Sequence, residues 1–140
     1  MKRFAHLPLL MLMLLAAPLA MAQSQSNASG KAEITFENDA IDYGSIEQNA
    51  NGEREFQFKN TGSQPLIITG CNGSCGCTVP ECPKEPIKPG ESGVIKVKYD
   101  TNRLGRFSKT ITVNSNASEP ARLLRISGEV LEPGSKENVN

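Results

Sequence analysis

The chain has 140 residues, with 15 basic and 15 acidic side chains and a formal net charge of +0 at pH 7. All four methionines and the only histidine, His6, lie within the first 22 residues, so a chain that begins at Gln23 has neither residue type. Because such a chain lacks histidine, histidine-dependent hydrolysis, mixed histidine and cysteine zinc sites and histidine-bound haem are excluded. Without Lys2 and Arg3, 13 basic residues face 15 acidic ones, which argues against a nucleic-acid partner.

The first 22 residues have the features of a signal peptide. Lys2 and Arg3 give a positive start, Leu7–Leu19 is apolar apart from two prolines, and Ala20-Met21-Ala22 supplies the small residues of a cleavage site. The apolar stretch is shorter than the about 20 residues of a spanning helix. We therefore expect cleavage before Gln23, no membrane span, and a soluble product that is periplasmic or secreted.

The rest of the chain is predicted to hold one domain with two flexible ends. Residues 23–31 form a polar lead without periodicity, and residues 133–140 form a tail. Over residues 32–132 the apolar side chains alternate with period two, and no stretch keeps a helical period. The predicted strands are Glu33–Glu37, Ala40–Tyr43, Glu53–Asn60, Pro65–Gly70, Gly76–Val79, Gly93–Tyr99, Phe107–Asn114 and Leu123–Val130.

Turn residues separate these strands, as in Asn60-Thr61-Gly62 and Lys88-Pro89-Gly90. Seven to eight short strands at this spacing favour an all-β, immunoglobulin-like β-sandwich over a small barrel. Proline is expected inside a strand only at its start, at Pro65, because it removes a ladder donor. The residues predicted to face inward are Phe56, Phe58, Ile95, Val97, Tyr99, Ile111, Val113, Leu124, Ile126 and Val130.

The four cysteines of the chain, Cys71, Cys75, Cys77 and Cys82, lie within 12 residues of one another. In an exported protein this clustering predicts two disulfides. In an extended strand Cys75 and Cys77 lie at the upper limit of a bridgeable Cα separation, so a bond between them requires Gly76 to bend the backbone. The pairings Cys71–Cys75 with Cys77–Cys82 and Cys71–Cys77 with Cys75–Cys82 are easier, and we favour the second.

Two other roles for the cluster stay open. A thiolate metal site would use Cys75 and Cys77 on one strand face, with Cys71 and Cys82 from flanking loops, to hold Zn²⁺ or Cu(I). Alternatively, Cys75-Gly76-Cys77 is a redox dithiol that exchanges with other thiols. The nearest basic residue in sequence is Lys84. Apart from the metal alternative, no cofactor is expected.

Charged residues gather around a glycine turn after the sixth predicted strand. Arg103, Arg106 and Lys109 flank Gly105 and are interpreted as a solvated hairpin tip, with anion binding as the alternative. Asp100 is expected to cap a turn with its side chain.

The residues also carry a resemblance that covers nearly the whole predicted domain, from Phe36 to Val130. The matching pieces are Asp42-Tyr43-Gly44-Ser45-Ile46, Phe56 to Gly62 with Pro65-Leu66, Ser74-Cys75-Gly76-Cys77-Thr78, Pro86 to Gly93, Tyr99-Asp100-Thr101 and Gly105 to Asn116 leading into Ile126-Ser127-Gly128. With these motifs the chain resembles the exported bacterial family catalogued as domain of unknown function 1573. That family is similar to hydin-like and major-sperm-protein-like immunoglobulin sandwiches, which implies a binding or scaffold module and no enzyme. The family motif covers Cys75 and Cys77 but neither Cys71 nor Cys82.

We therefore expect an exported, non-enzymatic binding or scaffold module of the bacterial cell envelope with a cysteine-braced loop. A periplasmic copper or zinc binder and a thiol–disulfide exchanger are the alternatives. The expected partner is an unidentified protein; an edge strand is the candidate contact surface, with the alternative that this strand only completes the core. The candidate edge is Glu33–Glu37, where Ile34 and Phe36 share a face and Thr35 is expected to supply an edge donor.

Overall fold

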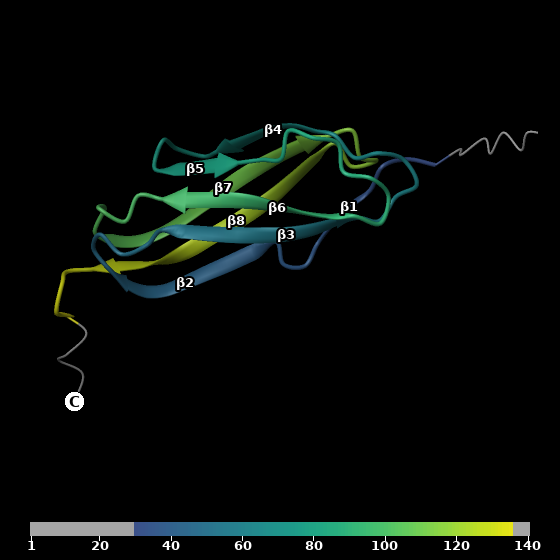
Figure 1. The fold of residues 1–140 in the computed structure, drawn as a ribbon. Coiled ribbons are helices and arrows are strands. Elements are labelled where there is room, and N and C mark those ends of the chain that lie inside the picture. The colour runs from purple at the N-terminus through teal and green to yellow at the C-terminus, as the bar shows by residue number, and fades with distance from the viewer. Residues whose placement is uncertain (1–29, 136–140) are drawn as a thin grey trace, which may run out of the picture.

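A computed structural model describes residues 30–135, which form two packed β-sheets (Figure 1). The predicted signal peptide and most of the predicted lead and tail lie outside these residues. The eight strands are β1 (Ile34–Phe36), β2 (Ala40–Glu47), β3 (Glu53–Asn60), β4 (Ile68–Gly73), β5 (Thr78–Glu81), β6 (Ser92–Tyr99), β7 (Gly105–Ser115) and β8 (Ala121–Leu131). The all-β, immunoglobulin-like prediction is confirmed.

The chain divides its first two strands between the sheets. One sheet has the order β1-β3-β6-β5 and the other has the order β2-β8-β7-β4. β2 pairs with β8 in parallel, whereas β1 pairs with β3 antiparallel. Residues 37–39 therefore carry the chain from one layer to the other, and β1 and β2 are edge strands on the same side of the sandwich.

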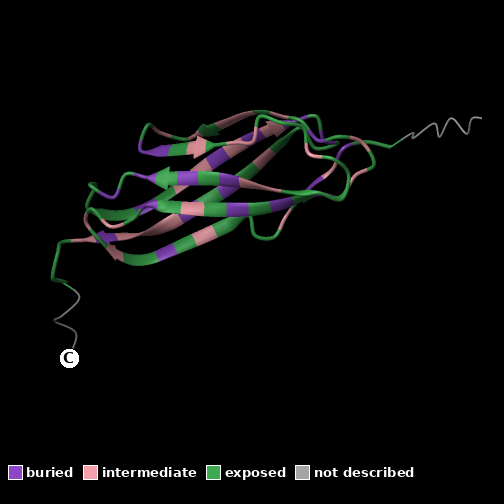
Figure 2. Ribbon diagram, in the orientation of Figure 1, coloured by how far each residue is buried: buried purple, intermediate pink, exposed green. Residues whose placement is uncertain are grey.

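The core lies between the two sheets and follows the predicted alternation (Figure 2). All ten residues expected to face inward are buried, and Phe56, Ile95, Ile111 and Ile126 have 1% or less of their surface exposed. Period-two alternation of apolar and polar residues places one face of each strand in the core. Burial of these side chains is the main stabilising contribution to such a fold.

A buried asparagine organises one end of the sandwich. The Asn60 side chain donates to the carbonyl oxygens of Gln64 at 2.8 Å and Ile87 at 2.9 Å. Its Oδ1 accepts from the amide of Gly62 at 3.0 Å and, more weakly, from that of Glu33 at 3.4 Å. A fully buried amide is tolerated because its hydrogen bonds replace those to water. These bonds hold the predicted Asn60-Thr61-Gly62 turn to Gln64, Ile87 and Glu33.

An aromatic cluster fills the other end. Tyr99 stacks on Phe107 with ring centroids 3.8 Å apart, and Tyr43 meets Phe107 edge-on at 5.3 Å. Gly128 of β8 makes room for this cluster, because a Cβ there would lie 2.8 Å from the Tyr43 Cβ and 2.9 Å from Phe107. Gly44, at φ +63°, forms a bulge in β2 that a side chain would strain.

Three strand predictions need correction. The predicted strand ended at Tyr43 because the period-two alternation of apolar residues breaks there. The structure accommodates this break as a bulge at Gly44, so β2 continues to Glu47. β4 begins only at Ile68 and continues to Gly73, so Cys71 lies in a strand and Gly76 in a turn. Pro80 lies within β5, which is tolerated because β5 is an edge strand and Pro80 occupies a position that faces away from β6.

The edge donor expected at Thr35 is also wrong. Thr61 N donates to Glu33 O at 3.0 Å and Glu37 N donates to Gln57 O at 3.0 Å, which shows that alternate β1 residues bond to β3. Thr35 pairs with Lys59 in the same register, so its amide faces β3 and not the open edge. β1 is an edge strand as predicted, but its outward peptide groups belong to Ile34 and Phe36.

The two long sides of the sandwich are closed differently. On the side of β4 and β5, a disulfide joins Cys71 of β4 to Cys82, just after β5. On the side of β1 and β2, two arginines span the layers. The Arg54 guanidinium of β3 lies 4.1 Å from the Tyr43 ring centroid, and that of Arg122 in β8 lies 5.7 Å from the centroid of Phe36.

Candidate functional site

The cysteine segment forms the end of β4, a turn and the start of β5. Ser74 anchors the turn to β7, because its amide donates to Thr110 O at 2.9 Å and its Oγ accepts from Thr110 N at 3.2 Å. Thr78 N closes the turn by donating to Cys75 O at 3.2 Å. These bonds hold the backbone in a bend at the position where the sequence predicted an extended strand.

The disulfide connectivity differs from both pairings that the sequence favoured. The structure joins Cys71 to Cys82, with Cα atoms 6.2 Å apart, and Cys75 to Cys77, with Cα atoms 5.2 Å apart. The favoured Cys71–Cys77 and Cys75–Cys82 pairing is therefore wrong. The bend over residues 74–77 brings Cys75 and Cys77 together, which an extended strand would not do, and leaves Cys71 facing Cys82 across the two edge strands.

In the disulfide-bonded form the four cysteines present no thiolate to a metal ion. All four cysteines are paired as disulfides, and metal ligation requires the thiolate. Among residues 30–135 no group of three or more histidine, cysteine, aspartate or glutamate side chains is placed to hold a metal ion. Cys75 and Cys77, the preferred candidate ligands, are bonded to each other instead.

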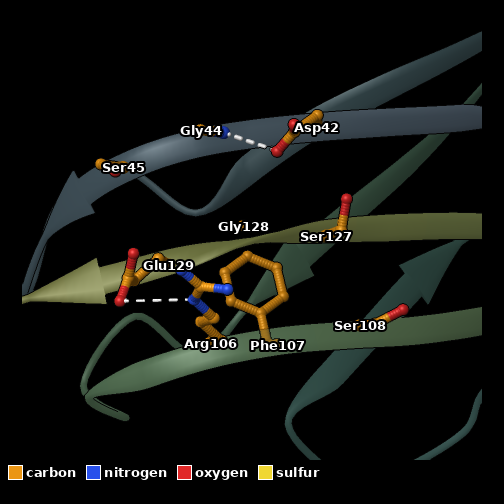
Figure 3. Close-up of a pocket in the computed structure, with 9 residues that line it drawn as sticks. All are labelled: Asp42, Gly44, Ser45, Arg106, Phe107, Ser108, Ser127, Gly128 and Glu129. Carbon is orange, nitrogen blue, oxygen red and sulfur yellow. Dashed lines mark hydrogen bonds and ion pairs between the residues drawn. The ribbon is translucent and has the colours of Figure 1, made fainter.

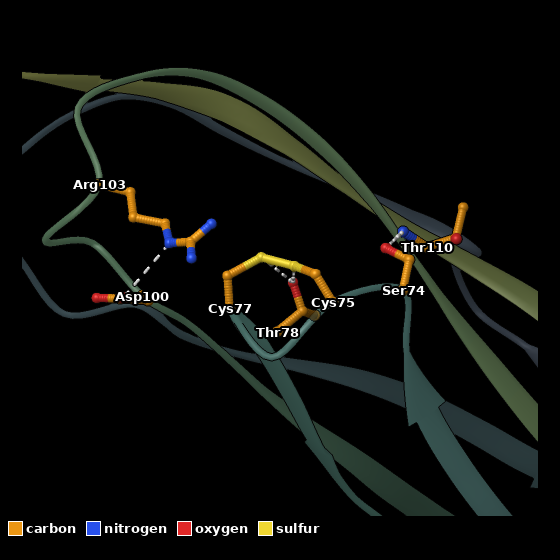
Figure 4. Close-up of a disulfide and its surroundings, with 7 residues drawn as sticks. All are labelled: Ser74, Cys75, Cys77, Thr78, Asp100, Arg103 and Thr110. Atoms are coloured by element: carbon orange, nitrogen blue, oxygen red, sulfur yellow. Dashed lines mark hydrogen bonds and ion pairs between the residues drawn. A yellow bond between two sulfur atoms is a disulfide. The ribbon is translucent and has the colours of Figure 1, made fainter.

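The surroundings of the Cys75–Cys77 disulfide are asymmetric. Cys77 is 3% exposed and belongs to the hydrophobic core, whereas Cys75 is partly exposed. The Oγ1 of Thr78, a residue 2% exposed, lies 3.7 Å from Cys77 Sγ and 3.9 Å from Cys75 Sγ. The hydroxyl of Thr78 is thus directed at the two sulfur atoms (Figure 4).

A cation faces the same disulfide. In Figure 4 the Arg103 guanidinium points from Asp100 toward the sulfur pair, and its Nε lies 3.7 Å from Asp100 Oδ2. Asp100 is held beside the site because its amide donates to Cys77 O at 2.8 Å, and its Oδ1 caps the following turn by accepting from Asn102 N at 3.1 Å. The capped turn was predicted. The orientation of Arg103 toward the disulfide was not predicted, because Lys84 is the nearest basic residue in sequence.

Electrostatic effects are clearest at the two buried tyrosines. Burial raises the pKa of Tyr43 to about 12, although the Arg54 guanidinium over its ring acts in the opposite direction. Burial also raises the pKa of Tyr99, partly offset by Arg103. The Tyr43 hydroxyl donates to Gly52 O at 2.7 Å, which links β2 to the segment before β3.

An open depression of about 610 Å³ lies over β2, β8 and β7 (Figure 3). Hydroxyls of Ser45, Ser108 and Ser127 line it, together with an ion pair between Arg106 Nε and Glu129 Oε1 at 3.7 Å. Sequence reasoning missed this group, since its members come from three strands and share no motif. Arg106 was interpreted as part of a solvated hairpin, and 86% exposure of its side chain agrees with that interpretation.

These features define the class of protein: an immunoglobulin-like β-sandwich with a cysteine turn at one edge. The chain belongs to the family described as Protein of unknown function (DUF1573), whose profile matches residues 34–130. This result confirms the resemblance drawn from the sequence motifs. No curated protein sequence matches the chain.

Solved structures share the fold at low sequence identity. A protein of unknown function from Porphyromonas gingivalis W83 is 16% identical with a TM-score of 0.64, over 77% of this chain and 51% of that one. The PapD-like domain 7 of human CEP192 is 9% identical with a TM-score of 0.61, over 73% of this chain and 87% of that one. A chaperone and tip adhesion subunit complex, CsuC-CsuE from Acinetobacter baumannii, matches at 13% identity and a TM-score of 0.53, over 78% and 61%. The chain thus spans about half the length of the Porphyromonas structure.

Between residues 30 and 135 the structure has no helix with the length and hydropathy needed to cross a membrane.

Proposed function

We propose that this protein is an exported, non-enzymatic binding module that holds an extended segment of a partner protein along the free edge of β2. Its compartment is the periplasm or the extracellular space, where the Cys71–Cys82 disulfide persists and braces the β4 edge. The observation that carries the proposal is the contrast between β2 and the other three sheet edges.

Those three edges are short or blocked. β1 has three residues, and the outward carbonyl of Ile34 accepts from Arg122 Nη1 at 3.3 Å. β5 has four residues and includes Pro80, which has no amide to donate. β4 is tied to the end of β5 by the Cys71–Cys82 disulfide. Short strands, prolines and covered edges are devices that prevent strand addition.

β2 is not short, contains no proline and is not covered by another described segment along its eight residues, and only the Gly44 bulge between Asp42 and Ser45 interrupts its ladder. Arg125 N donates to Asp39 O at 2.8 Å, so the peptide groups of Asp39 and Ile41 face β8. The alternate groups, those of Ala40 and Asp42, face away from β8. Unpaired amides and carbonyls on an edge strand can accept a strand from another chain, with main-chain hydrogen bonds supplying affinity. The chaperone and subunit complex that shares this fold supports a protein partner.

Site-specific photo-crosslinking in the native envelope tests the proposal. A photoreactive side chain at exposed Glu47 of β2 is expected to capture a discrete partner, identified by mass spectrometry of the adduct. The same side chain at Lys98 is the control, because Lys98 is exposed but belongs to the interior strand β6. Equal capture at both positions would contradict binding at the β2 edge.

A matched pair of proline variants sharpens this test. Ala40→Pro removes an outward donor of β2 and should abolish the adduct formed at position 47. Ala121→Pro makes the same exchange at the exposed start of β8, before the paired region of β2, and should leave the adduct intact. Both variants should fold, as checked by circular dichroism. An adduct that survives Ala40→Pro in a folded protein would refute the proposal.

A further inference from the structure

The Cys75–Cys77 disulfide adds little to the connection between the two sheets. Residues 75 and 77 are separated by two positions in sequence, and the bonds of Ser74 to Thr110 already anchor their turn. The separate Cys71–Cys82 disulfide joins the two edge strands. A bond that closes so short a loop removes little freedom from the unfolded chain, so a bracing role does not account for it.

The two sulfur atoms differ in access. Cys75 is partly exposed in the turn, whereas Cys77 is 3% exposed within the core cluster, so Cys75 is the more accessible residue to a thiol from solvent. Thiol–disulfide exchange requires an attacking thiolate to approach one sulfur while the other departs as a thiolate. The geometry therefore assigns Cys75 as the attacked sulfur and Cys77 as the leaving one.

Groups that stabilise a departing thiolate are already in place. The Thr78 hydroxyl lies 3.7 Å from Cys77 Sγ, and within residues 30–135 its hydrogen-bond partners are the two sulfur atoms. The Arg103 guanidinium points at the same pair, held by Asp100 (Figure 4). A hydroxyl donor and a cation stabilise the negative charge that develops on sulfur. The cation also attracts an anionic attacking thiolate.

We propose that the Cys75–Cys77 disulfide is an exchange site that accepts two electrons from a dithiol. A thiolate of the donor attacks Cys75 Sγ, the Cys75–Cys77 bond breaks, and Cys77 leaves as a thiolate. The second donor thiolate then attacks the donor sulfur bonded to Cys75, which releases Cys75 as a thiolate. The donor dithiol becomes a disulfide, and its two protons are taken up by Cys75 and Cys77. The exchange is stoichiometric, one disulfide for one dithiol, and it is independent of partner capture at the β2 edge.

Selective reduction of the oxidised protein is the first test. The protein is incubated with graded ratios of reduced to oxidised dithiothreitol, quenched with acid, alkylated and mapped by mass spectrometry. We expect the Cys75–Cys77 bond to open at least about tenfold faster than the Cys71–Cys82 bond in the same molecules. Equal rates for the two bonds, or opening of Cys75–Cys77 only after denaturant is added, would overturn the proposal.

The attacked sulfur is identified with a monothiol. Reduced glutathione cannot complete the second step intramolecularly, so an acid quench should trap its mixed disulfide. We expect the adduct on Cys75 and not on Cys77. In a second measurement, Cys77→Ala leaves a thiol at Cys75 and Cys75→Ala leaves one at Cys77, and the former should react about tenfold faster with an aromatic disulfide. An adduct found mainly on Cys77 would refute the assigned direction.

Thr78 and Arg103 are positioning residues in this scheme. Thr78→Val removes the hydroxyl with little change in shape, and Arg103→Gln removes the cation; each should slow Cys75–Cys77 opening about threefold relative to Cys71–Cys82 opening. Thr78→Ser should restore the rate. Arg106→Gln is the matched control, because Arg106 forms a similar 3.7 Å ion pair on another surface. Unchanged relative rates in both Thr78→Val and Arg103→Gln would show that these residues play no part in the exchange.

Discussion

At each long side of the sandwich the two sheets are linked to each other, but the two sides use different interactions. On one side, the Cys71–Cys82 disulfide links a strand of one sheet to the end of a strand of the other. On the opposite side, Arg54 reaches from β3 to Tyr43 of β2, and Arg122 reaches from β8 to Phe36 of β1. A covalent link resists separation until it is reduced, whereas arginine and aromatic contacts separate and reform. The second side is therefore the one on which a sheet edge can remain available.

The largest effect is expected from removal of the covalent link. A loop of this length gives roughly 3 kcal/mol on the chain-entropy estimate, against roughly 1.5 kcal/mol for the Cys75–Cys77 loop. We expect Cys71→Ala with Cys82→Ala to lower the free energy of unfolding by about twice as much as Cys75→Ala with Cys77→Ala. Denaturant unfolding of the two double variants measures this ratio. Equal losses of stability in the two double variants would show that the Cys71–Cys82 disulfide contributes no more than the Cys75–Cys77 disulfide to holding the β4 and β5 side together.

A smaller effect is expected at alkaline pH on the opposite side. The pKa of Tyr43 is raised to about 12 in the folded protein from an unfolded value of 10.0. The unfolded chain therefore loses this proton first, so the stabilisation is complete below pH 10 and is lost as pH rises toward 12. The loss should reach roughly 2–3 kcal/mol in the free energy of unfolding.

Denaturant unfolding from pH 9 to pH 12 measures this change, with Tyr43→Phe as the comparison. That variant loses the hydrogen bond to Gly52. Its free energy of unfolding should show only the weaker pH dependence due to Tyr99, whose pKa is also raised by burial. Identical pH profiles for the two proteins would exclude Tyr43 as the source.

The smallest effects are expected from the arginines. Arg54→Gln and Arg122→Gln should each reduce the free energy of unfolding by about 1 kcal/mol, because each removes a cation–aromatic contact and hydrogen bonds to carbonyl oxygens. Arg106→Gln should have almost no effect, since its side chain is 86% exposed. If the three variants are equally stable, the arginines do not hold the β1 and β2 side together.

Much of the fold was predictable because alternation in strands such as β3, β6 and β7 directly reports which face is buried. The ends of strands were less predictable. The Gly44 bulge extends β2 past Tyr43, and only the neighbouring β8 shows that the ladder continues. The connectivity of the cysteines was not predictable either, because it depends on a bend over residues 74–77 that is anchored by Thr110 of β7, a residue distant in sequence.

The candidate site was also predictable only in part. Cys75 and Cys77 were recognised from spacing alone, since closely spaced cysteines are chemically distinctive wherever they lie. Thr78 and Arg103 were not recognised, because a threonine and an arginine are common residues whose role depends on where their side chains point. Topology and register bring Asp100 beside Cys77, and Arg103 follows from that placement.

The parallel pairing of β2 with β8 also determines how the domain responds to tension. In Figure 1 the chain enters the sandwich at its right-hand end and leaves β8 at its left-hand end. A force that pulls these ends apart draws β2 and β8 past each other lengthwise, so the hydrogen bonds along their shared ladder are loaded together and not one after another. The parallel β2–β8 ladder should therefore resist a pull on the two ends of the domain more strongly than a ladder whose bonds open one at a time.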